Sequence, residues 1–344
     1  MKLFETLAEM GHEQVVMCSD PSIGYRGILA VHSTKLGPAL GGTRFWQYAT
    51  DEEAITDALR LSRGMTYKNA VAGLHLGGGK SIIIGDNKTK NREKIFRAHG
   101  RFVETLGGRY ITAEDVGTST RDMDYVHMET GHVAGLAGKS GDPSPVTAHG
   151  VFRAVQASAN HKWGSDSLGG KTVSIMGCGS VGSYLAKELH EAGAKLIVSD
   201  IDSAKTARVS KMTGASIVEG DAIFSANADI FSPCALGGII NDTTIPKLKV
   251  QIVAGAANNQ LLEERHGDEL QRRGILYAPD YVANAGGVIN VYGEVAGWDA
   301  QRALDKADDI YDTILKVFDI AESKHIPTYE AADRLAEQRL AEAR

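Results

Sequence analysis

The sequence predicts an α/β fold of two domains, a first domain with a mixed sheet and a second built on a doubly wound parallel sheet. At 344 residues the chain is long enough for two domains of roughly 150 residues each. In the second half, short apolar segments alternate with segments of helical period, which is typical of parallel βαβ units. The four predicted strands there cover residues 171–176, 195–200, 228–231 and 251–254.

Three strands and one long helix are predicted in the first half. Residues 28–32, 81–84 and 109–112 are rich in apolar or β-branched side chains, which favours strands of a mixed sheet. Thr50 and Glu53 have the spacing of a capping box, so a helix is predicted from there to about Tyr67. The apolar positions that repeat at helical spacing, ending at Lys68, are Ala54, Ala58, Leu61 and Met65. Lys68 is therefore expected at the end of the buried face.

A stretch dense in turn residues, 138–145, is predicted to link the halves. Ser144 and Pro145 fit an N-cap and first helical position, so a long helix is expected to open the second domain. Two charged amphipathic helices are predicted over 299–323 and 329–344. We predict domains over 1–143 and 144–324, with 325–344 returning to complete the first.

Composition excludes several classes of function. The formal charge of −6 argues against a nucleic-acid partner, which requires a basic surface. The N-terminus lacks the features of a signal peptide, and no run approaches the roughly 18 apolar residues of a membrane span, so a cytoplasmic protein without membrane contact is expected. The three separated cysteines suggest neither a disulfide framework nor a zinc site, and no metal is predicted.

A glycine turn marks the second domain as a binding site for a dinucleotide. Gly177, Gly179 and Gly182 follow the predicted strand 171–176 and lead into a helix expected from about Val181 to Glu191. Such a turn lets a pyrophosphate approach the backbone N–H groups of the helix start, here Ser180 and Val181. Asp200, at the end of the next strand, has the spacing of a ribose-binding acid. Residues 144–324 are thus predicted to be a Rossmann-type domain that binds NAD. The acidic Asp200 and Asp202 disfavour the 2′-phosphate of NADP.

Lys68 and Lys80 are the candidate catalytic residues of the first domain. Lys80 follows the glycine run 77–79, where the backbone is expected to approach a small ligand closely. Both lysines are predicted to be buried, and two ammonium groups in one dehydrated cleft would lower at least one pKa from about 10.4. One would bind a carboxylate and the other would act as a base. Asp115, after a strand, is a candidate proton relay, with a structural cap or ion pair as the rival interpretation.

Several segments resemble the glutamate/leucine/phenylalanine/valine dehydrogenases: residues 36–44, 64–70, 77–81, 112–117, 233–238 and 255–260. The resemblance spans almost the whole chain. It is strongest to the leucine and valine dehydrogenases, with some tryptophan dehydrogenase character near the C-terminus. It implies reversible, NAD-dependent oxidative deamination of an L-amino acid to a 2-oxo acid and ammonia, and a homo-oligomer. In this likeness Lys68 binds the substrate carboxylate, Lys80 is the base that activates water, and Asp115 assists proton transfer at the amine.

The resemblance also supplies pocket positions. Those near the cofactor are Thr147, Ala235 and Asn284, in addition to the glycine turn. Those near the substrate are Leu40, Gly41, Gly42, Met65, Ala113, Asn259, Val288 and Val291. None offers a charge to a substrate side chain, so leucine, valine or isoleucine is expected. Tyr292 and Trp298 leave an aromatic amino acid open as an alternative. A 2-hydroxy acid dehydrogenase and a non-catalytic NAD-sensing protein are the alternatives from other classes.

Overall fold

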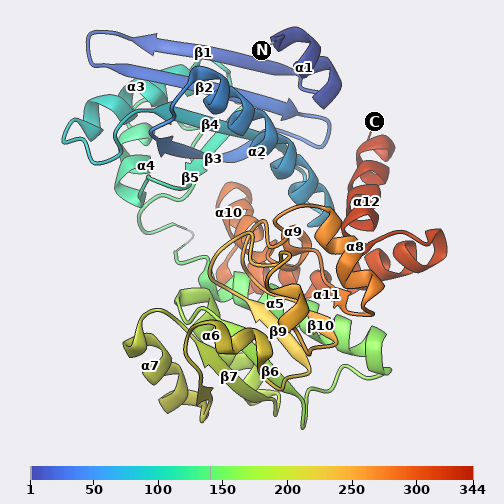
Figure 1. Cartoon of the computed structure of the whole chain (residues 1–344). Coiled ribbons are helices and arrows are strands. Elements are labelled where there is room, and N and C mark those ends of the chain that lie inside the picture. The colour runs from blue at the N-terminus through green and yellow to red at the C-terminus, as the bar shows by residue number, and fades with distance from the viewer. Residues whose placement is uncertain (1, 140, 344) are drawn as a thin grey trace. The chain divides into compact units, whose positions relative to one another are not determined.

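The computed structural model describes residues 2–139 and 141–343, and the chain divides into two compact units (Figure 1). Unit 1 comprises residues 1–141, 294–297 and 336–344, and unit 2 comprises residues 142–293 and 298–335. Ser140, within the predicted link, lies outside the described residues. The fold class predicted from the sequence is confirmed, because one unit holds a mixed sheet and the other a parallel one.

Unit 1 is built on a five-stranded mixed sheet of order β1-β2-β4-β3-β5. Strands β1 and β2 pair antiparallel, as do β2 and β4, whereas β3 lies parallel to β4 and β5. The strands are β1 Gln14–Asp20, β2 Tyr25–Ser33, β3 Ala39–Trp46, β4 Gly77–Ile84 and β5 Tyr110–Glu114. The sequence patterns missed β1 and β3, the latter because two central glycines break its apolar pattern.

Helices cover both faces of this sheet. The helices in the N-terminal segment of unit 1 are α1 Leu3–Met10, α2 Asp51–Val71, α3 Arg92–Glu104 and α4 Thr120–His127. Helix α2 packs over Ile28, Ile82 and Ile84, and Figure 1 shows it lying along the sheet. Side chains of α3 and α4 form a second cluster with Phe45 and Ile83. Because side chains alternate along a strand, neighbouring residues of β4 therefore face different helices.

Helix α2 begins as predicted but differs in two details. Thr50 caps it by accepting a hydrogen bond from the backbone N–H of Glu53 at 3.1 Å. The Glu53 carboxylate accepts instead from the Ala49 N–H at 3.0 Å, so the predicted capping box is only half formed. The helix also continues past Tyr67 to Val71.

Unit 2 is built on a six-stranded sheet of order β11-β10-β9-β6-β7-β8, in which each described strand pair is parallel. The strands are β6 Thr172–Met176, β7 Lys195–Ser199, β8 Ser216–Ile217, β9 Ile230–Pro233, β10 Ile252–Val253 and β11 Leu276–Tyr277. Numbered within the unit, this order is 6-5-4-1-2-3, the order of a doubly wound dinucleotide-binding sheet. Strands β8 and β11 have two residues each, too few for a sequence pattern to reveal.

The helices of the second half connect these strands and end the chain. They are α5 Ser144–Trp163, α6 Ser180–Glu191, α7 Ser203–Thr213, α8 Arg265–Arg272, α9 Asp280–Ala283, α10 Gly286–Ala296, α11 Ala300–Lys324 and α12 Thr328–Glu342. Ser144 is the first residue of α5 and not its cap, because Pro143 occupies the N-cap position. Asp142 Oδ1 accepts the Ser144 N–H at 2.9 Å. Within the described residues, no helix is long and apolar enough to cross a membrane.

Candidate active site

Lys80 and Asp115 form a buried ion pair in unit 1. Lys80 Nζ lies 2.7 Å from Asp115 Oδ2, and only 5% of Lys80 is exposed. Lys80 shares the helix α2 face of β4 with Ile82 and Ile84. Asp115 directly follows β5, whose last residue, Glu114, is in register with Thr43 of the intervening strand β3. The parallel strands thus bring the predicted base and the predicted relay into direct contact.

Burial and charge act in opposite senses on this pair. Burial is the largest influence on Lys80 and lowers its pKa, although the neighbouring carboxylate of Asp115 opposes the shift. For Asp115 burial is again the largest influence and would raise the pKa, but Lys80 and Arg44 together outweigh it and the pKa is lowered. Asp115 is therefore ionised at neutral pH, and Lys80 gives up its proton more readily than a solvated lysine.

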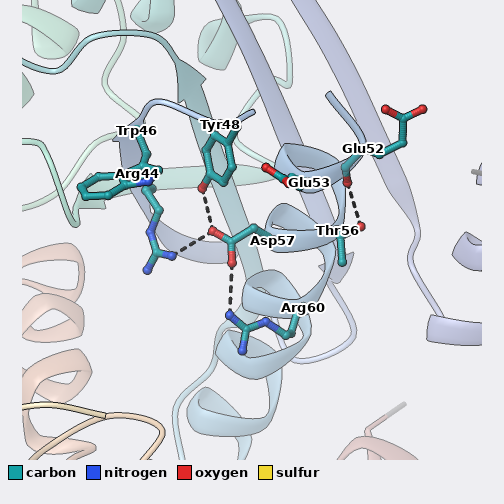
Figure 2. Close-up of a pocket in the computed structure, with 8 residues that line it drawn as sticks. All are labelled: Arg44, Trp46, Tyr48, Glu52, Glu53, Thr56, Asp57 and Arg60. Atoms are coloured by element: carbon teal, nitrogen blue, oxygen red, sulfur yellow. Dashed lines mark hydrogen bonds and ion pairs between the residues drawn. The ribbon is translucent and has the colours of Figure 1, made fainter. Parts of the chain in front are cut away.

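Arg44 extends the pair into a chain of alternating charges. Its Nε lies 3.1 Å from Asp115 Oδ2, and its Nη1 lies 2.8 Å from Asp57 Oδ2. Asp57 also accepts hydrogen bonds from the Tyr48 hydroxyl at 2.6 Å and from Arg60 at 3.2 Å, drawn as dashed lines in Figure 2. Arg44, Tyr48, Asp57 and Arg60 line a pocket of about 560 Å³. Sequence reasoning gave Arg44 and Asp57 no role, because only the pairing of β3 with β4 and the packing of α2 bring them beside Lys80.

The glycine run before Lys80 is required by packing within unit 1, whatever its relation to a ligand. A Cβ on Gly77 would lie 1.9 Å from the Ser33 carbonyl oxygen, and one on Gly78 would lie 2.0 Å from the Thr66 nitrogen. A Cβ on Gly79 would lie 2.6 Å from the Tyr110 ring. Protein atoms therefore already fill the space that the absent side chains leave.

Lys68 lies on α2 and is partly exposed, so the prediction that it is buried is wrong. The buried face of α2 is centred on Ala58, Leu59, Ser62 and Thr66. The predicted face through Leu61 and Met65 lies at its edge, where a side chain can reach both the sheet and solvent. Of the two lysines, only Lys80 is enclosed.

The predicted substrate positions fall in both units. Leu40 and Ala113 are buried in adjacent strands, and Met65 Cγ would lie 3.3 Å from a Cβ on Gly41. A Cβ on Gly42 would meet the Glu114 carbonyl oxygen at 2.3 Å, so this glycine is also required by packing. The three remaining substrate positions belong to unit 2: Asn259, with a left-handed φ of 51°, and Val288 and Val291 on α10.

A buried hydrogen-bond network holds the three parallel strands together on the opposite face. Thr43 Oγ1 lies 2.8 Å from Ser81 Oγ, 2.5 Å from Thr112 Oγ1 and 3.0 Å from His99 Nε2. The Tyr110 hydroxyl donates to the Gly41 carbonyl at 2.6 Å. These bonds position the strands that carry Arg44, Lys80 and Asp115. In the sequence, the only sign of this network is that small polar residues stand next to the predicted site residues.

The glycine turn of unit 2 has the shape of a pyrophosphate cradle. Gly177 has a φ of 106°, and a Cβ there would lie 2.8 Å from the Cys234 carbonyl carbon and 2.9 Å from Ala235. A Cβ on Gly182 would lie 2.0 Å from the Gly177 oxygen, so this glycine lets α6 approach the strand. Gly179 faces open space, with no atom within 4 Å of its Cβ position. The middle glycine thus leaves the room that a phosphate group needs beside the start of α6, Ser180 and Val181.

Asp200 follows β7 and is tied to the turn. Its Oδ2 accepts the Cys178 N–H at 2.7 Å and its Oδ1 accepts the Asp202 N–H at 2.9 Å. Arg208 donates to the Cys178 carbonyl oxygen at 3.3 Å, so an arginine does lie beside this turn although none was expected there. Asp200 thus remains the only described carboxylate that contacts the glycine turn, with a cation beside it.

The other predicted cofactor positions lie around the same sheet. Ala235 contacts the turn at Gly177, and Thr147 lies in the first turn of α5. Asn284 donates to the Ala256 carbonyl oxygen at 3.0 Å and to Asn258 Oδ1 at 2.9 Å. Its own Oδ1 is buried and has no hydrogen-bond partner in the described structure. A buried acceptor without a donor fits a site completed by a ligand that carries an N–H group.

Comparison with known proteins assigns the chain to a family. Residues 12–132 match the family model for the Glu/Leu/Phe/Val dehydrogenase dimerisation domain, and residues 138–204 and 199–344 match that for Glutamate/Leucine/Phenylalanine/Valine dehydrogenase. The chain belongs to the Glu/Leu/Phe/Val dehydrogenase family. The resemblance seen in the sequence is thereby confirmed.

Individual members of this family are similar along their whole length. Leucine dehydrogenase from Thermoactinomyces intermedius is 56% identical over 99% of this chain and 94% of its own. L-tryptophan dehydrogenase from Nostoc punctiforme is 50% identical over 100% of this chain and 98% of its own. A crystal structure of L-tryptophan dehydrogenase from Nostoc punctiforme superimposes with a TM-score of 0.92 at 47% identity, covering 99% of both chains.

As a member of the Glu/Leu/Phe/Val dehydrogenase family, the protein is an amino acid dehydrogenase that carries out oxidative deamination. Enzymes of this family use a nicotinamide cofactor. The open space beside Gly179, the Asp200 carboxylate and the unpartnered Asn284 oxygen fit such a group. Among the described residues, no cluster of three or more His, Cys, Asp or Glu side chains could hold a metal ion.

Proposed function

We propose that the protein catalyses the NAD-dependent, reversible oxidative deamination of an apolar L-amino acid, with leucine, valine or isoleucine as substrate. The observation that carries the proposal is the buried contact between Lys80 Nζ and Asp115 Oδ2, which supplies a general base and a proton acceptor side by side. Further support is the leucine dehydrogenase relatives, 54 to 56% identical over the chain.

Three side chains of unit 1 divide the chemistry. Lys68, partly exposed at the edge of α2, binds the substrate carboxylate as a cation. Asp115, held ionised, accepts a proton from the substrate amine. Lys80, with its lowered pKa, accepts a proton from water. Asn259, Val288 and Val291 of unit 2 remain predicted substrate-binding residues in this proposal.

The reaction balances with these roles. Loss of a hydride from Cα and of a proton from the amine turns the amino acid into an imino acid. The nicotinamide ring, when bound, is the hydride acceptor. Water then adds to the imine carbon while neutral Lys80 takes its proton. Asp115 returns its proton to the nitrogen, which gives the carbinolamine. The hydroxyl proton passes to the nitrogen as the C–N bond breaks, so ammonia and the 2-oxo acid are left and the proton taken from water stays on Lys80.

We assign NAD as the cofactor because of Asp200. A carboxylate at the end of the second strand accepts hydrogen bonds from the ribose hydroxyls of NAD and repels the 2′-phosphate of NADP. Because the cation Arg208 also lies beside the turn, the preference for NAD over NADP depends on the Asp200 carboxylate. An Asp200→Ser variant is expected to bind NAD more weakly and NADP more strongly. Unchanged discrimination between NAD and NADP in steady-state kinetics would contradict this assignment.

An aromatic amino acid is the second candidate for the substrate. Two observations favour it. One is the full-length similarity to an L-tryptophan dehydrogenase structure, and the other is the edge-to-face contact of Tyr292 with Trp298, whose ring centroids lie 5.0 Å apart. An apolar pocket discriminates one methylene by only about 1 to 3 kcal/mol, so the branched-chain substrates are expected to overlap in activity.

We also propose that the protein is a homo-oligomer. Residues 12–132 match a family model described as a dimerisation domain. Strand β1 lies at one edge of the unit 1 sheet and exposes Met17, which gives that domain a surface to cover. Light scattering after size exclusion would show a mass of at least twice 36.7 kDa. A monomeric mass at micromolar concentration would contradict this proposal.

Formation of NADH, followed by absorbance at alkaline pH, tests the reaction and its substrate together. Activity is expected with L-leucine, L-valine and L-isoleucine, with little from L-tryptophan or a 2-hydroxy acid. A preference for L-tryptophan would select the aromatic alternative. Binding of NAD without turnover of any amino acid would instead indicate a sensor. A Lys80→Ala variant is expected to lose at least about 100-fold in kcat, in line with loss of a general base.

A further inference from the structure

We propose that Arg44 and Asp57 are positioning residues, in which Asp57 anchors Arg44 and Arg44 holds the Asp115 carboxylate in its contact with Lys80. The inference rests on the proposed roles of Lys80 and Asp115. Neither Arg44 nor Asp57 needs to contact substrate for this role.

The sheet register accounts for the arrangement. Arg44 of β3 is in register with Ile82 of β4, and paired residues of neighbouring strands point to the same face. Ile82 packs under α2, so Arg44 lies on the face that carries Lys80 and that α2 covers. Asp57 lies on α2 itself, which places a carboxylate within reach of the guanidinium.

The contacts of Arg44 show why an arginine is used. Nε binds Asp115 and Nη1 binds Asp57, so the guanidinium is held from two sides at fixed angles. A lysine offers a single nitrogen and cannot bridge both carboxylates in this geometry. The side chains are only partly exposed, 22% for Arg44 and 15% for Asp57, so solvent screens their pair less than a surface pair.

Asp57 has the contacts that an anchor requires. Its Oδ2 accepts hydrogen bonds from both Arg44 and the Tyr48 hydroxyl, and its Oδ1 accepts one from Arg60 (Figure 2). Burial would raise the pKa of Asp57, but the Tyr48 hydroxyl and the two arginines outweigh burial and lower it. Asp57 therefore stays charged at neutral pH, and Arg44 keeps its partner.

The charges of Arg44 and Asp57 are opposite, so their removal has opposite effects on the pKa of Lys80. Three charged groups act on Lys80: Asp115 after β5, Arg44 on β3 and Asp57 on α2. Its neighbour in register on β2 is the apolar Ala30. The positive Arg44 lowers the pKa of Lys80, whereas the negative Asp57 raises it. Loss of one or the other charge must therefore move the titration of Lys80 in opposite directions.

The experiment is the pH profile of kcat/KM for amino acid oxidation. Arg44→Gln is expected to move the acidic limb to higher pH and Asp57→Asn to lower pH, each by roughly 0.5 to 1 pH unit. Arg44→Lys keeps the charge but not the bridge, so it should lower kcat by about tenfold or more with a smaller shift of the limb. Arg26→Gln, which removes an arginine from an exposed pair with Asp51 in the same unit, is the matched control and should match the wild type.

The outcomes separate this inference from the proposed function. If Lys80→Ala retains normal turnover, the assignment of the base is wrong. If Lys80→Ala is inactive but the Arg44→Gln and Asp57→Asn limbs coincide with the wild type, or move the same way, the positioning role is overturned. Asp57→Asn preserves the shape of the side chain, so it alone decides the matter if Arg44→Gln does not fold.

Discussion

Gly78 and Thr66 lie against each other so closely that a Cβ on Gly78 would stand 2.0 Å from the Thr66 backbone nitrogen. Gly78 lies two residues before Lys80 on β4, and Thr66 lies two residues before Lys68 on α2. The absence of a side chain at Gly78 thus lets the elements that carry the two lysines pack against each other.

Gly78→Ala is expected to destabilise the protein by about 1 to 3 kcal/mol, because the new methyl group must push α2 from the sheet. Gly64→Ala is the matched control, since Gly64 lies on the same helix with no atom within 4 Å of its Cβ position. That change should stabilise by up to about 1 kcal/mol through helix propensity. Urea unfolding measures both values, and equal effects of the two substitutions would contradict the packing role.

The glycine turn allows a similar separation of folding from binding. Gly179→Ala should leave stability unchanged, because its φ of −66° suits alanine and the space is open, but should raise the KM for NAD by about tenfold or more. Gly182→Ala should instead lower the thermal midpoint, since its Cβ would meet the Gly177 oxygen. Calorimetry and cofactor titration together check this pair; unchanged affinity in Gly179→Ala would contradict a phosphate site there.

Two buried histidines of unit 1 predict sensitivity to acid. Burial lowers the pKa of His99 to about 3 and is also the largest cause that lowers that of His32 to about 4. Both pKa values lie below that of histidine in the unfolded chain, about 6.5. The stability that the neutral histidines contribute is therefore present above about pH 6.5 and is lost as pH falls toward the pKa values of the folded state. Unfolding free energy should drop by at least about 2 kcal/mol between pH 6.5 and 4.5. His99→Gln should flatten this slope, and an identical slope would refute its assignment.

His149 of unit 2 predicts the opposite dependence. Its Nδ1 lies 2.8 Å from Glu188 and its Nε2 lies 3.1 Å from Asp308, and the bond with Glu188 is the largest cause that raises its pKa. The stability that this raised pKa contributes is fully present below about pH 6.5, the pKa of histidine in the unfolded chain. It is lost as pH rises through the pKa of the folded state. His149→Gln should therefore cost up to about 1 kcal/mol at pH 6, limited by solvent screening, and less at pH 8.5. Equal losses at both pH values would show that the charge is not responsible.

The sequence could predict the parts of the fold that local patterns determine. Strand β6, the glycine turn and Asp200 follow each other within a short segment, so their spacing alone indicated the site. Strand β3 could not be predicted, because Gly41 and Gly42 interrupt its apolar pattern and are explained only by the neighbouring backbone. Arg44 and Asp57 could not be assigned a role for the same reason: they meet through strand register and helix packing. Lys68 was expected to be buried because the predicted face of α2 was centred too near Leu61 and Met65.

Lys80 belongs to β4, which has hydrogen-bonded neighbours on both sides, β2 and β3, within the unit 1 sheet. The amides of such a strand are expected to exchange with deuterium only through rare opening of the whole sheet. Loop motion elsewhere in unit 1 is therefore not expected to shift the backbone that carries Lys80. Variant libraries that aim at a new amino acid should therefore leave this strand intact and diversify the edge of α2 and the exposed faces around it.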